Sequence, residues 1–411
     1  MRVAVWHNLP SGGGKRALYN HVEGLLEQGH YVESWCPDTA DQSFLPLGRI
    51  IKENVRPLRK RSRRYHDTLR PFGVARELVA VLDEQCRRCA AEINSRDFDL
   101  LFAGACLFVR TSAIARYLTI PSVLYLGEPY RWFYEALPDL PWIAPGHLRP
   151  TLRGLARFAA NHMLLSGIRL QAEAERMQAL DFRRILVNSL YSREAILRTY
   201  NINARVCLLG VDVDKYRSTG EGREDFVLGV GTIYHGKGVD RAIRAVAEIP
   251  AIKRPQLVWV GNGAASTDLT EYRRLAASLG VTLRTMENVT DGEVISLMSR
   301  ARAMVYPPRL EPFGLAPLEA NACETAVAGV AEGGVRESVC EGVNGFLAAE
   351  DDPRLLAAAL MRILETPEPA ELGRRARAHV VEHWSLPHGT RNLIAALSTV
   401  ARENRDKEHA S

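Results

Sequence analysis

The architecture of this chain can be worked out from residues 305–322, which read VYPPRLEPFGLAPLEANA. The apolar run ending at Tyr306 predicts a buried strand, and Pro307 and Pro308 end that strand because neither can donate to a sheet ladder. A helical pattern begins after Gly314. In open α/β sheets, ligands bind where the carboxyl end of a strand leads into a helix, so this loop is a candidate binding site.

Two glutamates belong to this strand–loop–helix unit, with Phe313 and Gly314 between them. Glu311 falls in the loop, and Glu319 falls about one turn into the helix. The free amides at Gly314 and Leu315, together with the helix dipole, are suited to hold a phosphate. A glutamate pair alone is more often a solvated helix face, so the surrounding motifs have to decide between the two interpretations.

Further motifs follow the glutamates, GGVRE at residues 333–337 and GVNGFL at residues 342–347. With the Glu-x7-Glu pattern, they resemble the donor-binding half of the family-4 glycosyltransferases (glycosyltransferase group 1), which are retaining enzymes. The resemblance is best over residues 185–350 and can be traced in the first thirty residues. It implies an α/β protein of the GT-B fold, with two Rossmann-like domains facing a central cleft.

The length of 411 residues also favours two domains over one. The resemblance places a Rossmann-like acceptor domain at residues 1–205, completed by a C-terminal crossover helix at 385–411. It places the Rossmann-like nucleotide-sugar donor domain at residues 206–384. We expect the polar residues after Arg402 to be frayed.

Composition indicates a soluble globular protein, with 46% hydrophobic and 25% charged residues. No apolar run approaches the roughly 20 residues that span a bilayer, and the first residues read as a strand rather than a signal peptide. The seven cysteines are scattered, which fits reduced thiols and a cytoplasmic location. We interpret Cys86 and Cys89 as helix-packing thiols rather than zinc ligands.

Basic residues crowd residues 49–70, although the net charge is only +5. This block fits a solvated loop, a pyrophosphate-linked acceptor, or peripheral contact with an anionic membrane at the inner membrane face. Nucleic acid is not an expected partner because aromatic interleaving and known motifs are missing there. A long helical pattern further on carries apolar residues that predict core packing, with a membrane-surface helix as the alternative. These residues are Leu152, Leu155, Phe158, Leu164 and Leu165.

The first domain offers two groups of candidate residues. Gly12, Gly13 and Gly14 follow the first strand and precede a helix, but they match neither a P-loop nor a dinucleotide fingerprint. By resemblance, Gly13 and Gly14 face the donor phosphates and Gly12 faces the acceptor. Glu128 stands where mannose-transferring relatives carry a His, just before a Pro-x-Arg segment that ends at Arg131, an acceptor-side candidate.

The second domain supplies most of the donor site. Lys237 matches the family lysine that neutralises the donor diphosphate, whereas Thr232 replaces the family's arginine. Arg309 is a candidate for the second positive charge. Other donor-binding residues implied by the resemblance are Gly231, Thr232, Gly261, Gly263, Phe313, Gly314, Leu315 and Glu319.

The resemblance implies a hexosyl-type transfer from a nucleoside-diphosphate sugar, of the GDP-mannose type or UDP-linked, to a hydroxyl acceptor. Catalytic candidates are Glu311, Glu128 and Lys237, and Glu319 is expected to bind the ribose. The acceptor remains open among a sugar, a lipid-linked group and a small molecule. No cofactor or metal is expected, because Asp212-x-Asp214 falls in the family's inter-domain linker although it spells a metal-binding motif.

Two other functions stay open. A non-catalytic nucleotide-sugar-binding protein is suggested by Thr232, Glu128, Glu324 and Ala326, where the family more often has Arg, His, Gly and Pro. A sugar-nucleotide epimerase or a phosphorylase on the same scaffold would need its own acid–base residues or a cofactor lysine.

Overall fold

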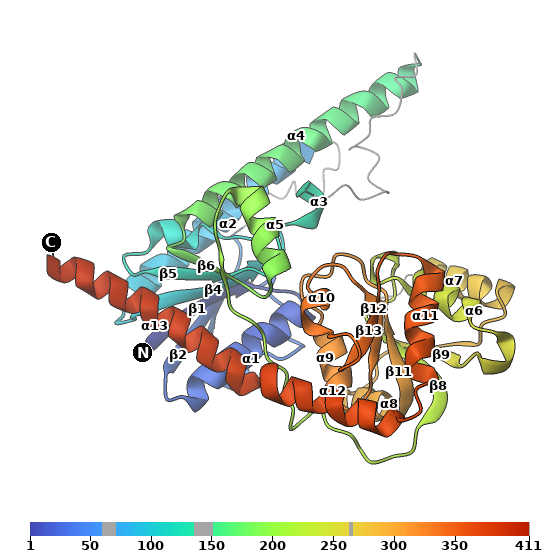
Figure 1. The fold of residues 1–411 in the computed structure, drawn as a ribbon. Coiled ribbons are helices and arrows are strands. Elements are labelled where there is room, and N and C mark those ends of the chain that lie inside the picture. The colour runs from blue at the N-terminus through green and yellow to red at the C-terminus, as the bar shows by residue number, and fades with distance from the viewer. Residues whose placement is uncertain (60–70, 135–150, 263–265, 411) are drawn as a thin grey trace. The chain divides into compact units, whose positions relative to one another are not determined.

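The computed structural model describes residues 1–59, 71–134, 151–262 and 266–410 (Figure 1). The chain divides into two compact units. The first unit contains Met1–Asn188, Ser192–Cys207 and Thr390–Ser411, and the second contains Ser189–Tyr191 and Leu208–Gly389.

The first unit is built on a seven-stranded sheet in the order β3-β2-β1-β4-β5-β6-β7, and every neighbouring pair is parallel. Its strands are β1 (Arg2–Asn8), β2 (Tyr31–Cys36), β3 (Lys52–Val55), β4 (Leu100–Cys106), β5 (Ser122–Tyr125), β6 (Arg184–Val187) and β7 (Arg205–Val206). Its helices are α1 (Gly13–Glu27), η1 (Leu47–Arg49), α2 (Pro71–Asn94), η2 (Ala113–Tyr117), α3 (Arg131–Tyr134), α4 (Leu152–Asp181) and α5 (Leu190–Tyr200).

The second unit is built on a six-stranded parallel sheet in the order β10-β9-β8-β11-β12-β13. Its strands are β8 (Glu224–Val230), β9 (Gln256–Val260), β10 (Leu283–Met286), β11 (Ala301–Tyr306), β12 (Val327–Val330) and β13 (Gly345–Ala348). Its helices are η3 (His235–Lys237), α6 (Val239–Glu248), η4 (Ala251–Lys253), α7 (Ser266–Ser278), α8 (Asp291–Arg300), α9 (Leu315–Ala322), α10 (Val335–Ser338), α11 (Pro353–Leu364) and α12 (Pro369–His383). The predicted α/β class with two Rossmann-like sheets is therefore confirmed.

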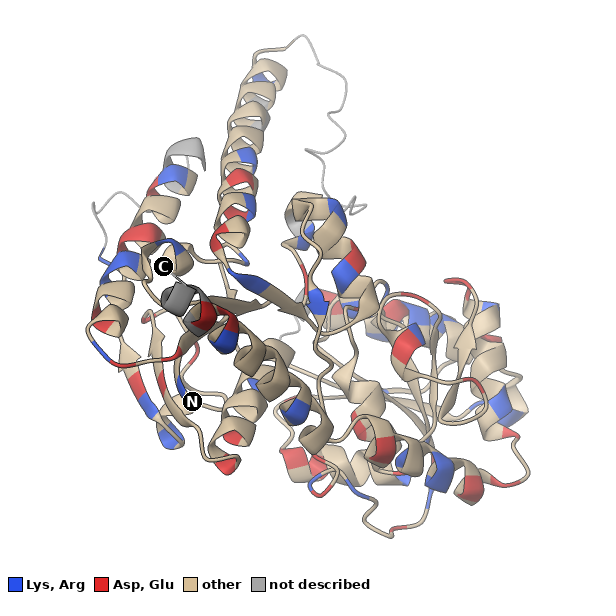
Figure 2. Cartoon of the chain, turned by 60° about the vertical axis from the view of Figure 1, so that its left-hand side comes forward, with Lys and Arg blue, Asp and Glu red and all other residues tan. Residues whose placement is uncertain are grey.

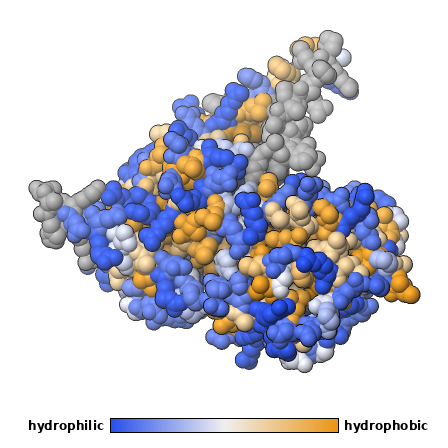
Figure 3. Space-filling model, in the orientation of Figure 1, coloured by the Kyte–Doolittle hydropathy of each residue, from blue (hydrophilic) through white to orange (hydrophobic). Residues whose placement is uncertain are grey.

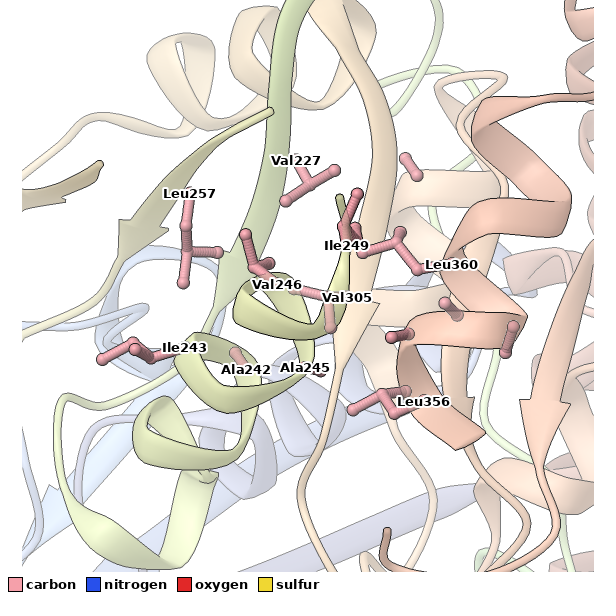
Figure 4. Packing of buried hydrophobic residues seen from close by; sticks show 14 of the residues in the cluster. Val227, Ala242, Ile243, Ala245, Val246, Ile249, Leu257, Val305, Leu356 and Leu360 are labelled. Atoms are coloured by element: carbon pink, nitrogen blue, oxygen red, sulfur yellow. The ribbon is translucent and has the colours of Figure 1, made fainter. Parts of the chain in front are cut away.

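Helices cover the second sheet through apolar residues at helical spacing. Ile243 and Val246 of α6 are fully buried beside Val227 of β8 and Leu257 of β9, and Leu360 of α11 joins the same core (Figure 4). Parallel strands buried on both faces read as continuous apolar runs, and the sequence of β9 is of this kind. This core fixes the strand ends from which the site loops emerge.

The first core contains both cysteines of the C-x-x-C pattern. Cys86 and Cys89 of α2 are buried in a cluster with Trp6 and Trp35, and burial raises the pKa of both thiols. Their interpretation as helix-packing thiols is confirmed.

The last helix, α13 (Leu386–Ala410), contributes Thr390 and the residues after it to the first unit. It packs closely on α1, since a Cβ added to Gly24 would lie 2.3 Å from Oγ1 of Thr390. The helix continues to Ala410, and the expectation that the residues after Arg402 are frayed stays a prediction. Glu403 accepts a 2.9 Å hydrogen bond from Arg184, which ties this part of the helix to β6.

Helix α4 departs from the prediction in its N-terminal half. Leu152 is 88% exposed, Leu155 51% and Phe158 52%, so core packing was wrong for these three residues. Leu164 and Leu165, one to two turns later, are partly buried as expected. Apolar surface along α4 can be followed in Figure 3. None of the described helices is long and apolar enough to span a membrane.

Candidate functional site

The loop between β11 and α9 places Glu311 at the carboxyl edge of the second sheet. Gly314 ends the loop with φ 90°, a left-handed conformation that favours glycine, and it is the N-cap of α9. No side chain caps the first turn of this helix. An uncapped helix start of this kind can bind an anion, and the phosphate-binding role expected of these amides stays a prediction.

The GGVRE motif holds this loop in place through its two glycines. A Cβ on Gly333 would lie 2.3 Å from the carbonyl oxygen of Glu311, and one on Gly334 would lie 2.3 Å from that of Pro312. The amide of Gly334 also donates a 2.8 Å hydrogen bond to the carbonyl oxygen of Glu311. The glycines are needed because two backbone segments touch there.

Lys237 and Glu311 form an ion pair, with Nζ and Oε2 2.8 Å apart and side chains 26% and 18% exposed. Lys237 ends η3, and Gly238 with φ 75° turns the chain into α6. Gly231, at the end of β8, lies under the lysine stem, since its added Cβ would be 3.4 Å from Lys237 Cγ. A Cβ on Gly261 would meet the Gly231 carbonyl oxygen at 1.8 Å. Lys237 therefore stands over a glycine-lined strand edge.

Glu319 joins the same region on α9, with only 5% of its surface exposed. Burial raises the pKa of the Tyr306 phenol well above its usual value, and the charges of Glu311 and Glu319 raise it further. Both carboxylates are thus close enough to act on one phenol at the end of β11. The second unit brings together one ammonium, two carboxylates and an uncapped helix start.

Arg309 and Phe313, two other predicted donor-side residues, contact other side chains of the second unit. The guanidinium of Arg309 binds both carboxylate oxygens of Glu332 at 2.9 and 2.7 Å, and it lies 3.2 Å from Asp351. Its charge is therefore compensated within the second unit. Phe313 is buried against Trp384, with ring centroids 5.6 Å apart.

Thr232 and Gly263 complete the donor-side predictions. The carbonyl oxygen of Thr232 accepts a 2.9 Å hydrogen bond from the amide of Tyr234, which closes the turn before Lys237. Gly263 lies outside the described residues.

The first unit contains the remaining candidates. Gly12 has φ 130° and is the N-cap of α1, without a side-chain cap, so the amides near Gly13 and Gly14 begin an open helix end. Glu128 has oxygens 3.4 Å from Nη2 of Arg110 and 3.9 Å from Nε of Arg131. The Glu128 carboxylate is therefore held between two arginines, and its correspondence to the family's His stays a prediction.

Glu175 of α4 is a residue that the sequence did not single out. It is fully buried and accepts hydrogen bonds from the Tyr200 hydroxyl, the Tyr130 amide at 3.0 Å and the Arg110 amide at 3.1 Å. Burial raises its pKa despite these hydrogen bonds. Glu175 thus anchors the two segments that flank Glu128. The signal that could have identified Glu175 in the sequence is an acidic residue on the inward face of a predicted helix.

The GVNGFL motif has a structural role. Nδ2 of Asn344 donates to Oδ1 of Asn321 at 3.0 Å and to the Ser338 carbonyl oxygen at 2.9 Å. Its Oδ1 accepts from the amide of Cys340 at 2.7 Å. This buried network fixes the C-terminal end of α9, the helix that carries Glu319.

Asp212 closes a turn, because its Oδ1 accepts hydrogen bonds from the amides of Asp214 at 3.1 Å and Lys215 at 2.9 Å. Within the described ranges, the one cluster of three or more side chains with metal-ligand spacing lies elsewhere. It consists of His7, Cys36 and Glu53 in the first unit.

Comparison with known proteins gives matches over both units. Residues 214–379 match the family Glycosyl transferases group 1. The D-inositol 3-phosphate glycosyltransferase of Mycolicibacterium paratuberculosis is 32% identical over 241 residues, which cover 54% of this chain and 53% of the relative. The chain thus spans about half the length of this curated relative.

Solved structures match the chain over nearly its whole length. A glycosyltransferase from Rickettsia africae superposes with a TM-score of 0.69 at 14% identity, covering 97% of this chain and 98% of that one. Anabaena Alr3699/HepE, solved in complex with UDP, gives 0.68 at 16% identity over 97% and 100% of the two chains. Residues 214–379 of the second unit are therefore similar to the glycosyl transferases group 1 family, and the chain as a whole has the GT-B fold, as the sequence predicted.

Proposed function

We propose that this chain is a retaining, metal-independent glycosyltransferase that moves a sugar from a nucleoside-diphosphate sugar to a hydroxyl acceptor. The observation that carries the proposal is the Lys237–Glu311 pair beside the uncapped start of α9, within a group 1 domain. A nucleoside diphosphate leaves with negative charge, and an ammonium and helix-start amides are groups that stabilise such charge.

The site residues of the second unit then bind different parts of the donor. Glu311 holds Nζ of Lys237 at 2.8 Å, so the ammonium is positioned before the diphosphate arrives. Glu311 also faces hydroxyls of the donor sugar, and Glu319 accepts hydrogen bonds from the ribose. Carboxylates suit both tasks because they accept strong hydrogen bonds from two hydroxyls at once.

The donor is a UDP-linked sugar or a sugar of the GDP-mannose type. UDP is supported by the structure of the Anabaena neighbour in complex with UDP, and GDP-mannose is supported by the Pro-x-Arg segment ending at Arg131. The relative named D-inositol 3-phosphate glycosyltransferase supports a small polyhydroxylated acceptor. Retention proceeds by front-face attack, in which the leaving phosphate takes the acceptor proton.

The first test is a thermal-shift panel with GDP, UDP, ADP, dTDP and CDP, each with EDTA or with Mg²⁺. A ligand at 100 times its Kd stabilises the folded protein by about 2.7 kcal/mol. One responding nucleotide, indifferent to EDTA, supports a metal-free donor site. Absence of any response counts against the proposal.

The matching sugar nucleotide is then incubated without an acceptor. Slow hydrolysis, followed by NMR of the released sugar, supports turnover with retained anomeric configuration. Binding without hydrolysis or transfer favours the non-catalytic alternative. A sugar nucleotide returned with an inverted ring carbon favours the epimerase.

We also propose that the protein is cytoplasmic and touches an anionic membrane peripherally through α4. The first 21 residues of this helix contain three arginines and no acidic residue, and the next residue is Glu173 (Figure 2). The exposed Leu152, Leu155 and Phe158 lie in the same half. A helix that is basic and apolar fits an anionic lipid surface.

Vesicles of phosphatidylserine and phosphatidylcholine test this contact against vesicles of phosphatidylcholine alone. The wild-type protein should sediment with the anionic vesicles, and the double variant Leu155→Ser, Phe158→Ser should lose most of that binding. Leu197→Ser is a matched control, because Leu197 is 44% exposed on α5. Equal sedimentation of both variants would contradict the role of α4.

Arg56 belongs to the basic block near residues 49–70. Arg56 is bound by Glu92 through hydrogen bonds of 2.6 and 2.8 Å, so its charge is compensated. Lys60, Arg61, Arg63 and Arg64 lie outside the described residues.

A further inference from the structure

A cluster of buried polar side chains lies at the carboxyl edge of the first sheet. His7 stands near the end of β1, Cys36 ends β2, and Glu53 belongs to β3. Lys15 reaches the cluster from the first turn of α1. His7 and Lys15 are both fully buried, and the Glu53 side chain is 4% exposed. The donor chemistry proposed for the second unit uses none of these groups.

Glu53 fixes the tautomer of His7. Its Oε1 lies 3.0 Å from Nε2 of His7, and the thiol of Cys36 donates to the same oxygen at 3.6 Å. Burial raises the pKa of Glu53, but the hydrogen bond and charge of His7, the charge of Lys15 and the hydrogen bond from the Gly48 amide hold it below its usual value. An ionised carboxylate only accepts, so Nε2 of His7 carries the proton and Nδ1 presents a lone pair.

Two polar atoms of the cluster have no partner in the described part of the chain. They are Nδ1 of His7, an acceptor, and Nζ of Lys15, a donor, and both are buried. Lys15 is close enough that its charge contributes to the lowered pKa of His7, after the larger effect of burial. An unmatched buried polar atom is costly, so a donor and an acceptor left open in one cluster point to a ligand group that is itself both.

We infer that His7 and Lys15 form a subsite for a hydroxyl of a neutral polyol, on the acceptor side of the proposed transferase. The hydroxyl donates to Nδ1 of His7, and the ammonium of Lys15 donates to a ligand oxygen. The position fits, because His7 lies one residue before the end of the strand that leads into the Gly12–Gly13 helix start, where open α/β sheets bind ligands. This inference rests on the proposed function.

Charge selects a hydroxyl over other ligands. The carboxylates of Glu53 and Asp41 both act on Lys15, so a phosphate there would meet two negative charges. A metal ion would meet the Lys15 ammonium, and one of its three candidate ligands, Glu53, already binds the other two, His7 and Cys36. A hydroxyl carries no charge and both donates and accepts.

The test follows the ¹⁵N resonance of His7 Nδ1 in the full chain, with myo-inositol, UDP-glucose and inorganic phosphate as separate probes. Myo-inositol should move this resonance, as expected when the lone pair accepts a hydrogen bond. Lys15→Met should weaken myo-inositol binding by about tenfold, because a hydrogen bond from a charged donor is lost. Lys52→Met is the matched control, since Lys52 is 62% exposed in the same unit.

Stability separates a binding role from a structural one. Burial lowers the pKa of Lys15, so folding disfavours its charged form, and Lys15→Met should raise the melting temperature while it weakens binding. A variant less stable than wild type would make Lys15 a structural residue and overturn the inference. So would a His7 resonance that responds to phosphate or to UDP-glucose but not to myo-inositol.

Failure of the inference is distinguishable from failure of the proposed function. UDP and GDP binding are measured on the same samples, and the donor site in the second unit should be unaffected by Lys15→Met. Nucleotide binding with no response to myo-inositol would overturn the hydroxyl subsite alone. No nucleotide binding by the wild-type protein would overturn the proposed function itself.

Discussion

Replacing Lys237 with methionine should weaken binding of the diphosphate while binding of the rest of the donor stays the same. The substitution keeps the apolar stem over Gly231 and removes the ammonium that Glu311 holds at 2.8 Å. A hydrogen bond to a charged group contributes roughly 1.5–3 kcal/mol, which corresponds to about a 10- to 100-fold loss of affinity for UDP or GDP. The loss should fall at the upper end, because Glu311 would be left unneutralised near the phosphates.

This substitution should leave the stability of the folded protein nearly unchanged. Both side chains of the pair are partly exposed, 26% and 18%, and an ion pair open to solvent contributes about 0–1 kcal/mol. The melting temperature without ligand should therefore stay close to that of the wild type. Lys253→Met is the matched control, since Lys253 also pairs with a carboxylate, Glu365, at 2.6 Å in the same unit.

Isothermal titration calorimetry with UDP, GDP, UMP and GMP measures the effect. If Lys237 serves the diphosphate, the variant binds a nucleoside diphosphate little better than the monophosphate, whereas the wild type and Lys253→Met prefer the diphosphate. Unchanged diphosphate affinity, or an equal loss for mono- and diphosphate, would refute the reasoning.

Four other substitutions test the remaining assignments. Glu311→Gln frees the lysine and removes a negative charge, so calorimetry should show equal or tighter UDP binding while sugar transfer falls. Glu319→Gln should weaken nucleoside binding by about tenfold and affect the 2′-deoxynucleotide less, because a charge-assisted bond to ribose is lost. Gly334→Ala puts a Cβ 2.3 Å from a carbonyl oxygen and should lower the melting temperature, whereas Gly222→Ala, with open space around it, should not. Burial lowers the pKa of His21 from 6.5 to about 4. Between these values the unfolded chain binds a proton that the folded chain does not, so the free energy of unfolding decreases by up to about 3 kcal/mol as the pH is lowered from 6.5 to 4, and urea unfolding of His21→Leu should lack this loss.

The parts of the site that follow from local pattern could be predicted from the sequence. The apolar run before Pro307 and the helical pattern after Gly314 placed Glu311 in a loop and Glu319 on a helix, as the structure has them. Such patterns work because strand ends and helix starts depend mainly on neighbouring residues.

Polar residues in buried positions could not be predicted in this way. Strand β3 carries Glu53 and Asn54, so its sequence lacks an apolar run although it pairs with β2. Lys15 follows three glycines and looks like a surface lysine, yet it is fully buried. The side chains that surround Glu53 and Lys15 come from distant parts of the chain, and a single sequence does not show them.

Helix α4 shows the opposite case, in which apolar residues are exposed rather than polar residues buried. The spacing of Leu152, Leu155 and Phe158 correctly predicted a helix, but they are exposed. Periodicity reveals which side chains share a face of a helix. It does not reveal whether another element of the same chain covers that face.

The path of the chain through the two units has a consequence for its synthesis. Leu208–Gly389 of the second unit is a single uninterrupted segment, whereas the first unit needs Thr390 and the residues after it. Leu393, Leu397 and Val400 of α13 are buried, so this late segment supplies part of the first unit's interior. When synthesis has reached Gly389, the ribosome has therefore made the whole of the second unit's main segment. The first unit, most of which was made earlier, still lacks its last helix at that point. The half that is begun first is the half that is completed last.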